Sequence, residues 1–248
     1  MDFTFKKPKH ILALLILVMA LTIIVLLPLY TYYTQITTTS SLEQIPPQFR
    51  YAVELFTLII QLIFVAIGLF IIVPILWYKL VNKYSFKQIF NAIKLRREAM
   101  DIAILWGMLT MIAMFVILFI IGIILTTLGY NLDQSGNIKD LEGIFSVPSI
   151  FILVSIQPIG EEIFFRGFLL EKIQNTKGKI PAILITSILF GIAHLSYANI
   201  YPALITAILG VILAYMVIKT KHLITAISAH IFYNIISVSL YIIGSSFF

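Results

Sequence analysis

The sequence lacks cysteine altogether and contains few charged residues. Without cysteine, a disulfide framework and a cysteine-ligated zinc site are both excluded. Only 11% of the 248 residues are charged, whereas a soluble domain carries about 25%. In their place the chain is 60% hydrophobic, with a mean hydropathy of +1.05. These values indicate a polytopic, integral membrane protein whose apolar surface faces lipid or neighbouring helices.

The positive net charge does not point to nucleic acid as a partner. The formal charge is +6, but the lysines and arginines gather beside the apolar segments, where anionic lipid head groups would meet them. We therefore expect the lipid bilayer as a partner and no nucleic acid. The first apolar run is too long for the apolar region of a cleavable signal peptide.

Seven apolar segments follow one another along the chain. A membrane-spanning helix needs about 20 residues, whereas a strand of a membrane barrel needs only about 10. The sequence therefore predicts an all-α, polytopic transmembrane bundle of about seven spans, in which the shorter fifth and sixth segments could bury each other. The segments cover approximately residues 11–33, 51–78, 102–129, 147–170, 180–196, 201–218 and 222–246.

Basic residues alternate between the connections and predict an orientation. Cytoplasmic connections carry an excess of lysine and arginine. The N-terminus and every second connection are basic here, so we expect the N-terminus in the cytoplasm and the C-terminus outside. A short interfacial helix is expected within the basic connection 84–100. The basic residues of the N-terminus and of these basic connections are Lys6, Lys7, Lys9, Lys79, Lys83, Lys87, Lys94, Arg96, Arg97, Lys172, Lys177, Lys179, Lys219 and Lys221.

Two adjacent carboxylates, Glu161 and Glu162, interrupt the fourth apolar segment. Each charge at the centre of a membrane helix costs roughly 2.5–3.5 kcal/mol on insertion scales, so such residues usually serve chemistry or transport. Arg166 follows Glu162 by four residues and can form an ion pair with it on the same helix face. Glu161 points about 100° away, towards the side of Gln157, and is left without an obvious partner on its own helix.

Two more of the apolar segments supply further ionisable or polar side chains. His194 shares a stripe with Phe190 on the fifth segment, and His230 shares a face with Asn234 on the seventh. Measured from the basic ends at 1.5 Å per residue, Glu161, His194 and His230 lie about 16, 22 and 14 Å deep. The three side chains are therefore predicted to meet in one cavity, with His194 about a turn further out.

Such a group of side chains has the parts needed to hydrolyse an amide with an activated water. A desolvated glutamate can act as general base on a water, and a nearby histidine can share the proton transfer. A histidine and an asparagine can donate hydrogen bonds to a developing oxyanion. Alternatively, Glu161, His194 and His230 could ligate zinc or another divalent metal. The contiguous His-Glu-x-x-His motif is absent, so both alternatives stay open.

The same polar residues could also serve functions without catalysis. The carboxylates and Arg166 could be a structural ion-pair cluster, and His230 with Asn234 could join helices by hydrogen bonds. A proton-coupled transporter also uses acids and histidines at mid-membrane, although no repeated halves are visible here. A membrane regulator or immunity protein that binds another protein is a further alternative. A Glu161→Gln variant would distinguish these functions.

Taken together, the motifs resemble those of the CPBP intramembrane protease family. This family contains the CAAX prenyl endopeptidases and the bacteriocin-processing or bacteriocin-immunity membrane proteins. The resemblance covers roughly residues 147–246, and the motifs occur in the family's order on separate membrane helices. They are Glu161-Glu162-x-x-x-Arg166, Phe190-x-x-x-His194 and His230-x-x-x-Asn234.

The resemblance implies a catalytic role for four of these residues. Glu161 would be the base that activates the attacking water, and His194 would assist it. His230 and Asn234 would stabilise the oxyanion. Family members are usually called metalloproteases, so the resemblance implies a CPBP-type intramembrane (metallo)endopeptidase.

The resemblance also implies supporting roles for Glu162 and Arg166, which would shape the site. Residues 1–146 would then form N-terminal transmembrane helices with a basic cytoplasmic loop, and residues 147–248 the catalytic core. The expected substrate is a membrane-associated or lipid-modified peptide or protein. Composition and short loops favour a bacterial plasma membrane as the location, and the oligomeric state is left open.

Overall fold

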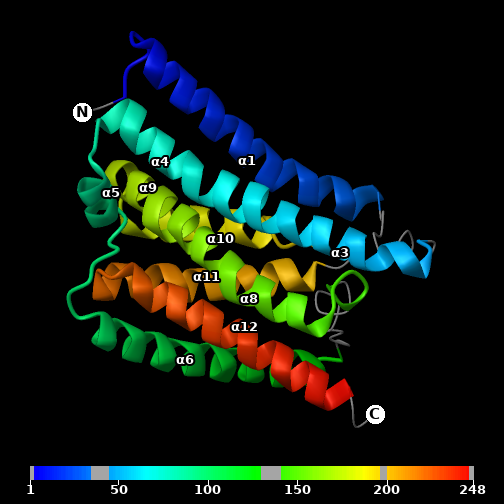
Figure 1. The fold of residues 1–248 in the computed structure, drawn as a ribbon. Helices are drawn as coiled ribbons and strands as arrows, with labels where there is room; N and C mark the ends of the chain where they lie inside the picture. Colours follow the sequence, from blue (N-terminus) through cyan, green and yellow to red (C-terminus); the bar gives the residue numbers. More distant parts are fainter. Residues whose placement is uncertain (1–2, 35–44, 130–140, 196–199, 246–248) are drawn as a thin grey trace.

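Long helices lie side by side through most of the chain and run between two ends of a bundle (Figure 1). The structure is a computed structural model that describes residues 3–34, 45–129, 141–195 and 200–245. All of the regular secondary structure in these ranges is helical. Within them, six helices are long and apolar enough to cross a membrane, which confirms the predicted all-α, polytopic membrane fold.

The six spans correspond to predicted apolar segments. In two of them the helix changes type along its length, so each combines several helical elements. The spans are α1 (Pro8–Thr34); Pro47–Asn82, made of α3 (Pro47–Ile60), η1 (Gln61–Ile72), α4 (Val73–Trp77) and η2 (Tyr78–Asn82); α6 (Met100–Thr127); Val147–Lys177, made of α8 (Val147–Glu162), η3 (Ile163–Leu169) and α9 (Leu170–Lys177); α11 (Tyr201–Thr220); and α12 (Leu223–Ser245).

The remaining predicted segment, 180–196, forms a helix that is too short to span. This helix, α10 (Lys179–Ile192), has 14 residues and is about 21 Å long at 1.5 Å per residue, whereas the hydrocarbon core is about 30 Å thick. The described chain therefore has six helices long enough to span and one shorter apolar helix, where about seven spans with shorter fifth and sixth segments were predicted. As expected for a short helix, α10 is packed against α11.

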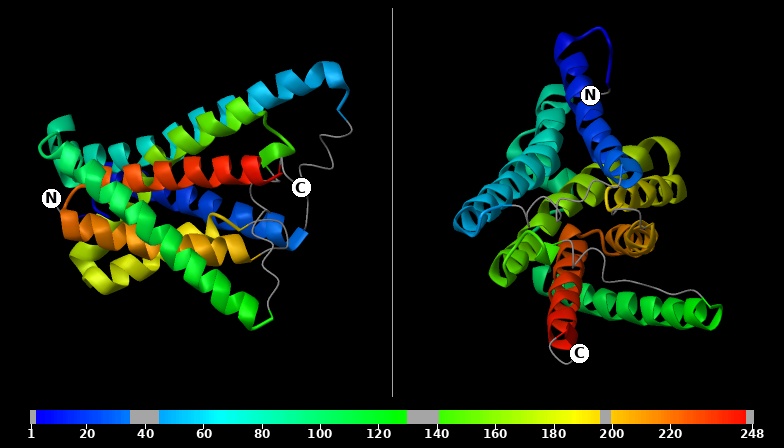
Figure 2. Two further views of the ribbon diagram at one scale, coloured as in Figure 1. Left: turned by 90° about the horizontal axis from the view of Figure 1, so that it is seen from below. Right: turned by 90° about the vertical axis from the view of Figure 1, so that its right-hand side faces the viewer.

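The site helices pack closely against one another in the middle of the bundle. Helix α8 packs against η1 and α12, and α12 also packs against α6 and α11. Figures 1 and 2 place α1 and α6 at opposite edges of the bundle. Gly160 lies where α8 meets η1, and a Cβ atom there would be 2.6 Å from the carbonyl oxygen of Ala66. Glycine is required at this contact because the two backbones approach so closely.

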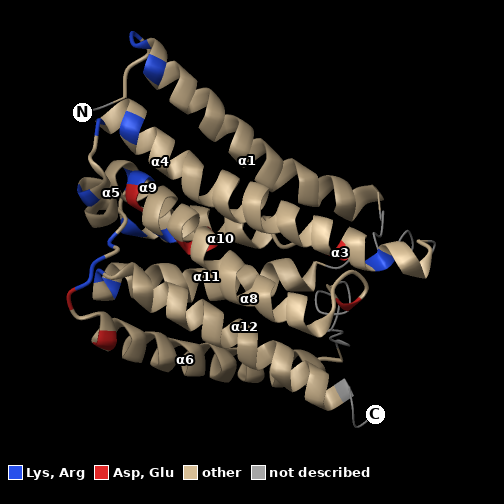
Figure 3. Cartoon of the chain, viewed as in Figure 1, with Lys and Arg blue, Asp and Glu red and all other residues tan. Residues whose placement is uncertain are grey.

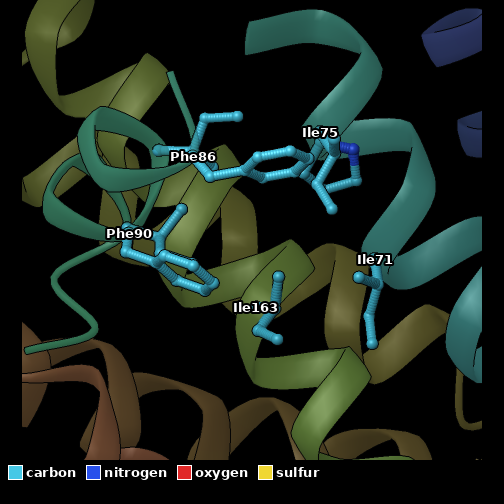
Figure 4. A pocket seen from close by; sticks show the side chains of 8 residues that line it. Ile71, Ile75, Phe86, Phe90 and Ile163 are labelled. Atoms are coloured by element: carbon cyan, nitrogen blue, oxygen red, sulfur yellow. The ribbon is translucent and has the colours of Figure 1, made fainter. Parts of the chain in front are cut away.

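The short interfacial helix predicted within 84–100 is α5 (Phe86–Ala92). Ser85 and Gln88 form a capping box at its start, and Phe86 and Phe90 remain 59% and 48% exposed. Between α5 and the second span lies a small apolar cavity of about 50 Å³ (Figure 4), lined by Ile71, Pro74, Ile75, Phe86, Ile89, Phe90, Ile93 and Ile163. Helix α5 covers only part of the connection 84–100. It ends at Ala92 because Lys94, shortly after it, takes a left-handed conformation with φ of 61°.

The charged residues are distributed unequally between the two ends of the bundle (Figure 3). We call one end of the bundle the lysine-rich end. It holds helix α5, the starts of α1, α6, α10 and α12, and the ends of α9 and α11. The opposite, cation-poor end holds the starts of α3, α8 and α11 and the end of α12, with Arg50, Glu54 and Glu142 as its described charged residues. The alternation predicted from the sequence therefore becomes a spatial separation, while the orientation in the membrane remains a prediction.

Candidate active site

The buried side chain of Glu162 lies at the centre of a polar network. Its Oε1 atom accepts a hydrogen bond from Nη1 of Arg166 at 2.8 Å and another from Nδ1 of His230 at 2.9 Å. Glu162 and Arg166 are each 0% exposed. The predicted ion pair on one helix is therefore present, and α12 joins it through His230.

Arg166 is held by an aromatic ring as well as by the carboxylate. Its guanidinium carbon lies 4.0 Å from the centroid of the Phe190 ring, close enough for a cation–π interaction. Phe190 is part of α10, so Arg166 connects η3 with α10 while Glu162 connects α8 with α12. A buried charge is tolerated only when such partners replace its water.

Glu161 faces a different direction from its neighbour and has its own partners. Its Oε1 atom accepts a hydrogen bond from Nε2 of Gln157 at 2.9 Å. Its Oε2 atom lies 3.9 Å from Nε2 of His230, which is longer than a direct hydrogen bond. Gln157 thus fixes one carboxylate oxygen, and the other is directed towards the imidazole and the space beside it.

The hydrogen bond to Glu162 defines how His230 presents its second nitrogen. A carboxylate only accepts hydrogen bonds, so Nδ1 of His230 carries the proton. Nε2 is therefore the nitrogen that faces Glu161. This arrangement, in which one ring nitrogen is fixed so that the other can act, is common for functional histidines.

His194 lies in the same region, just beyond the end of α10. Its ring is held by a backbone carbonyl and not by a carboxylate. Its Nδ1 atom is 2.8 Å from the carbonyl oxygen of Phe190, and because a carbonyl only accepts, Nδ1 is the donor. The His194 ring also stands edge-on to the Phe190 ring, with centroids 4.6 Å apart. Phe190 consequently contacts both His194 and Arg166, on two sides of the site.

A cavity of about 530 Å³ adjoins these side chains. Glu161, His194 and His230, which were predicted to meet in one cavity, all line it, and Asn234 lines it as well. Glu162 and Arg166 lie behind this lining and are fully buried. The volume is in the range of small-molecule sites, about 300–1,000 Å³.

The arrangement does not form the three-ligand metal site that was left open from the sequence. Among the described residues, no three histidine, aspartate or glutamate side chains are grouped so that they could hold a metal ion. Glu161 and His230 face each other across 3.9 Å, and His194 is not grouped with them in the way that a three-ligand site requires. We derive no step through a metal.

Sequence reasoning found the residues but not all of their contacts. It placed His194 with Glu161, whereas the imidazole in contact with both glutamates is that of His230. It also left Glu161 without a partner, although Gln157 lies four residues before it on the same helix. The i,i+4 spacing of Gln157 and Glu161 was the signal that could have predicted this hydrogen bond.

Comparison with known proteins locates a family match over the same helices. A protein-family model described as type II CAAX prenyl endopeptidase, Rce1-like, matches residues 143–236. This range contains all six predicted site residues, from Glu161 to Asn234. No curated protein and no solved structure was found to match the chain.

Proposed function

Because residues 143–236 form an Rce1-like type II CAAX prenyl endopeptidase domain, we propose that the chain is an intramembrane endopeptidase whose base is Glu161. It hydrolyses a peptide bond of a membrane-associated or lipid-modified peptide with a water molecule that Glu161 activates. The chain is an integral membrane protein, and we assign it to a bacterial plasma membrane with its lysine-rich end in the cytoplasm.

One observation carries this proposal. The free carboxylate oxygen of Glu161 and Nε2 of His230 face each other across 3.9 Å beside a cavity. A water between them could donate a hydrogen bond to the carboxylate while its oxygen stays directed to the cavity. A structural ion-pair cluster would not require a second glutamate beside a cavity, because Arg166 and His230 already pair with Glu162.

The reaction follows from these positions. Glu161 takes a proton from the water, and the water oxygen adds to the carbonyl carbon of the scissile bond. His230, when protonated, donates through Nε2 to the resulting oxyanion, and the side-chain amide of Asn234 supplies a second donor. The tetrahedral intermediate then collapses, the carbon–nitrogen bond breaks, and Glu161 returns its proton to the leaving amine. The products are a carboxylic acid and an amine, so atoms and charge balance.

The remaining site residues position these groups. Glu162 holds His230 through Nδ1, and Arg166 fixes Glu162 in turn. His194 lines the cavity with its Nδ1 bound to the Phe190 carbonyl, so its Nε2 is the nitrogen that can hold the water or share its proton.

The proposal is tested with the Glu161→Gln variant. The amide is nearly the same size but cannot take a proton, so we expect cleavage to fall by about 10²- to 10⁴-fold, which is the usual contribution of a general base. The assay is cleavage of a library of quenched fluorescent peptides by the purified protein in lipid vesicles.

The matched control is Glu98→Gln, which makes the same change at an exposed glutamate in the connection before α6. It should cleave like the parent protein. Equal cleavage by Glu161→Gln and the parent would remove Glu161 as the base. If neither protein cleaves any peptide while a cellular phenotype of the chain survives Glu161→Gln, a regulator or immunity protein would be the better description.

A further inference from the structure

We propose that helix α5 and the end of the second span bind one anionic phospholipid, whose phosphate is held by lysines and whose acyl chain lies against Phe86 and Phe90. This surface is separate from the candidate active site, and the inference does not depend on the proposed function. Three features support it: lysines without carboxylate partners, aromatic rings exposed on α5, and an apolar cavity beneath them.

The connection that contains α5 carries positive charge that no nearby carboxylate neutralises. Residues 79–97 include six lysines and arginines and no aspartate or glutamate. Among the described residues, neither Lys79 nor Lys87 forms a salt bridge. At the same end of the bundle, by contrast, Lys172 pairs with Glu171 at 3.0 Å. The charge around α5 is therefore available to an anion from outside the chain, such as a lipid head group.

Lys79 is held by an aromatic ring and keeps its charge accessible. Its Nζ atom lies 4.0 Å from the centroid of the Phe86 ring, which is a cation–π contact. An ammonium group has three N–H donors, so donors remain for a phosphate oxygen. Lys87 follows Phe86 directly and is exposed. Two lysines can therefore contribute to one phosphate site beside this ring.

Phe86 and Phe90 offer the adjoining surface for an acyl chain. They are 59% and 48% exposed, and both also line the apolar cavity of about 50 Å³ beside α5. Figure 4 shows Phe86 directed towards Ile75, and Phe90 on the side of Ile163. All residues that line this cavity are apolar, and such a space suits hydrocarbon and not water.

A phosphate site beside a hydrocarbon surface matches a phospholipid at the membrane interface. A helix with lysines and exposed aromatic residues lies at the boundary between head groups and acyl chains. Inorganic phosphate would use the lysines but not the rings, and a neutral lipid would use the rings but not the lysine charge. An anionic phospholipid uses both, so it is the ligand that this surface fits.

Contacts of α5 extend from the lipid surface to the helices of the candidate active site. Ile163, the first residue of η3, lines the apolar cavity. A Cβ atom on Gly167 would lie 3.0 Å from the Cβ atom of Ile93, just after α5. The backbone nitrogen of Leu223 donates a hydrogen bond to the carbonyl oxygen of Lys94 at 2.9 Å. A lipid that holds α5 in place would therefore also stabilise η3 and the start of α12.

Brominated lipids test the site, because bromine quenches tryptophan fluorescence only at close range. Phe86→Trp places a reporter on α5 and keeps a ring for Lys79, while Trp77→Phe and Trp106→Phe remove the two natural tryptophans. This reporter protein is reconstituted in dioleoylphosphatidylcholine vesicles. Brominated phosphatidylglycerol or brominated phosphatidylcholine is then added in increasing proportion, and the quenching curves give the relative binding of the two lipids.

Two double variants of the reporter protein separate a site from general charge attraction. The site variant is Lys79→Gln with Lys87→Gln, and the control variant is Lys177→Gln with Lys179→Gln, at exposed positions of the same end. One lysine near an anionic lipid is worth roughly a fivefold gain in binding. We expect the reporter protein and the control variant to prefer brominated phosphatidylglycerol by about tenfold or more, and the site variant to lose this preference.

Equal quenching of the reporter protein by the two brominated lipids would overturn the proposal. An equal loss of preference in the site and control variants would also overturn it, because it would show attraction to surface charge alone. Lys79→Arg with Lys87→Arg keeps both charges and should keep the preference. Glycerol phosphate lacks acyl chains and should not relieve the quenching, and relief would show a site for small anions. No cleavage is measured, so the result does not depend on the protease assignment.

Discussion

At the scale of single residues, the two adjacent glutamates differ in their surroundings. Glu162 is fully buried and accepts hydrogen bonds from two cationic or potentially cationic side chains. Glu161 accepts one hydrogen bond from a neutral amide and keeps one oxygen beside the cavity. In the proposed protease, the two identical side chains would therefore serve different purposes, Glu162 holding the site together and Glu161 reacting, because their partners differ.

The hydrogen bond from Gln157 is expected to position the base. In Gln157→Leu, the Glu161 carboxylate loses this donor and can turn away from the water. A hydrogen bond to a charged group is worth about 1.5–3 kcal/mol, so we predict that kcat falls by about tenfold or more while KM changes little. Steady-state kinetics measure the two constants separately.

Gln157→Asn is the companion variant, since it keeps the amide but shortens its reach. It should restore little activity, whereas Gln157→Glu would place a second carboxylate beside the base and should be less active than the parent. Unaltered kcat in Gln157→Leu would show that Glu161 is positioned by the helix alone.

The Glu162–Arg166 pair is expected to behave as a buried ion pair whose members depend on each other. Arg166→Leu leaves Glu162 buried without its main partner and should lower stability by about 3–5 kcal/mol. Replacing both residues with leucine removes both charges, so the double variant should be more stable than Arg166→Leu alone. Unfolding in detergent micelles, followed by circular dichroism, compares the variants.

Cleavage adds a second readout for the same pair. The double variant should remain inactive even where it is stable, because His230 has then lost the acceptor for Nδ1. If the double variant were as unstable as Arg166→Leu, an uncompensated charge would not be the cause of the instability.

At the scale of the helices, α10 is the element that departs most from the expected span. It ends at Ile192, so His194 lies just beyond a helix end and not inside a long helix. The contact with α11 compensates for its short length: a Cβ atom on Gly191 would lie 2.6 Å from the carbonyl oxygen of Ala203 and 2.8 Å from the Cβ atom of Ala207. Glycine at this position allows α10 to approach α11 and to hold Phe190 and His194 in place.

Gly191→Ala should therefore separate α10 from α11. We predict a lower melting temperature and a loss of cleavage, because Phe190 contacts both His194 and Arg166. The control is Gly122→Ala in α6, where a new Cβ atom would meet nothing within 4 Å. That variant should be unchanged or slightly more stable, since alanine favours helix by up to about 1 kcal/mol over glycine. Similar melting temperatures for the two variants would contradict the close contact.

The start of α8 is fixed by a residue from another span. Oε1 of Glu54 accepts hydrogen bonds from the backbone nitrogen of Ser146 at 2.9 Å and from the hydroxyls of Ser146 and Ser149, both at 2.6 Å. A carboxylate near a helix N-terminus is favourable because it meets unpaired N–H groups and the positive end of the helix dipole. Glu54 thus joins α3 to α8, the helix that carries Glu161 and Glu162.

At the scale of the whole molecule, the sequence was sufficient for the class of fold and for the polar side chains that line one cavity. Composition and run length predicted a helical membrane bundle, and motif residues on three segments predicted one shared cavity. These are properties of local pattern, and such patterns are strong in a membrane because each span must be long and apolar.

What the sequence could not supply depends on contacts between helices. Whether His194 or His230 lies against the glutamates is decided by the rotation of each helix and by close approaches such as that at Gly160. The end of α10 at Ile192 was not predicted either, since segment 180–196 is apolar enough to look like a span. The sequence gives the depth of a residue along the helix axis to about one turn, and this depth does not define how each helix is rotated about its axis.

Three buried phenylalanines next to the site have a consequence for how a catalytic cycle of the proposed protease would finish. Phe164, Phe165 and Phe168 follow the two glutamates along the chain and are each 0% exposed, so they fill the space behind Glu161. Under the proposed function, both fragments of a cleaved peptide would therefore leave through the cavity by which the peptide entered, and the protein would not thread a chain across the bilayer.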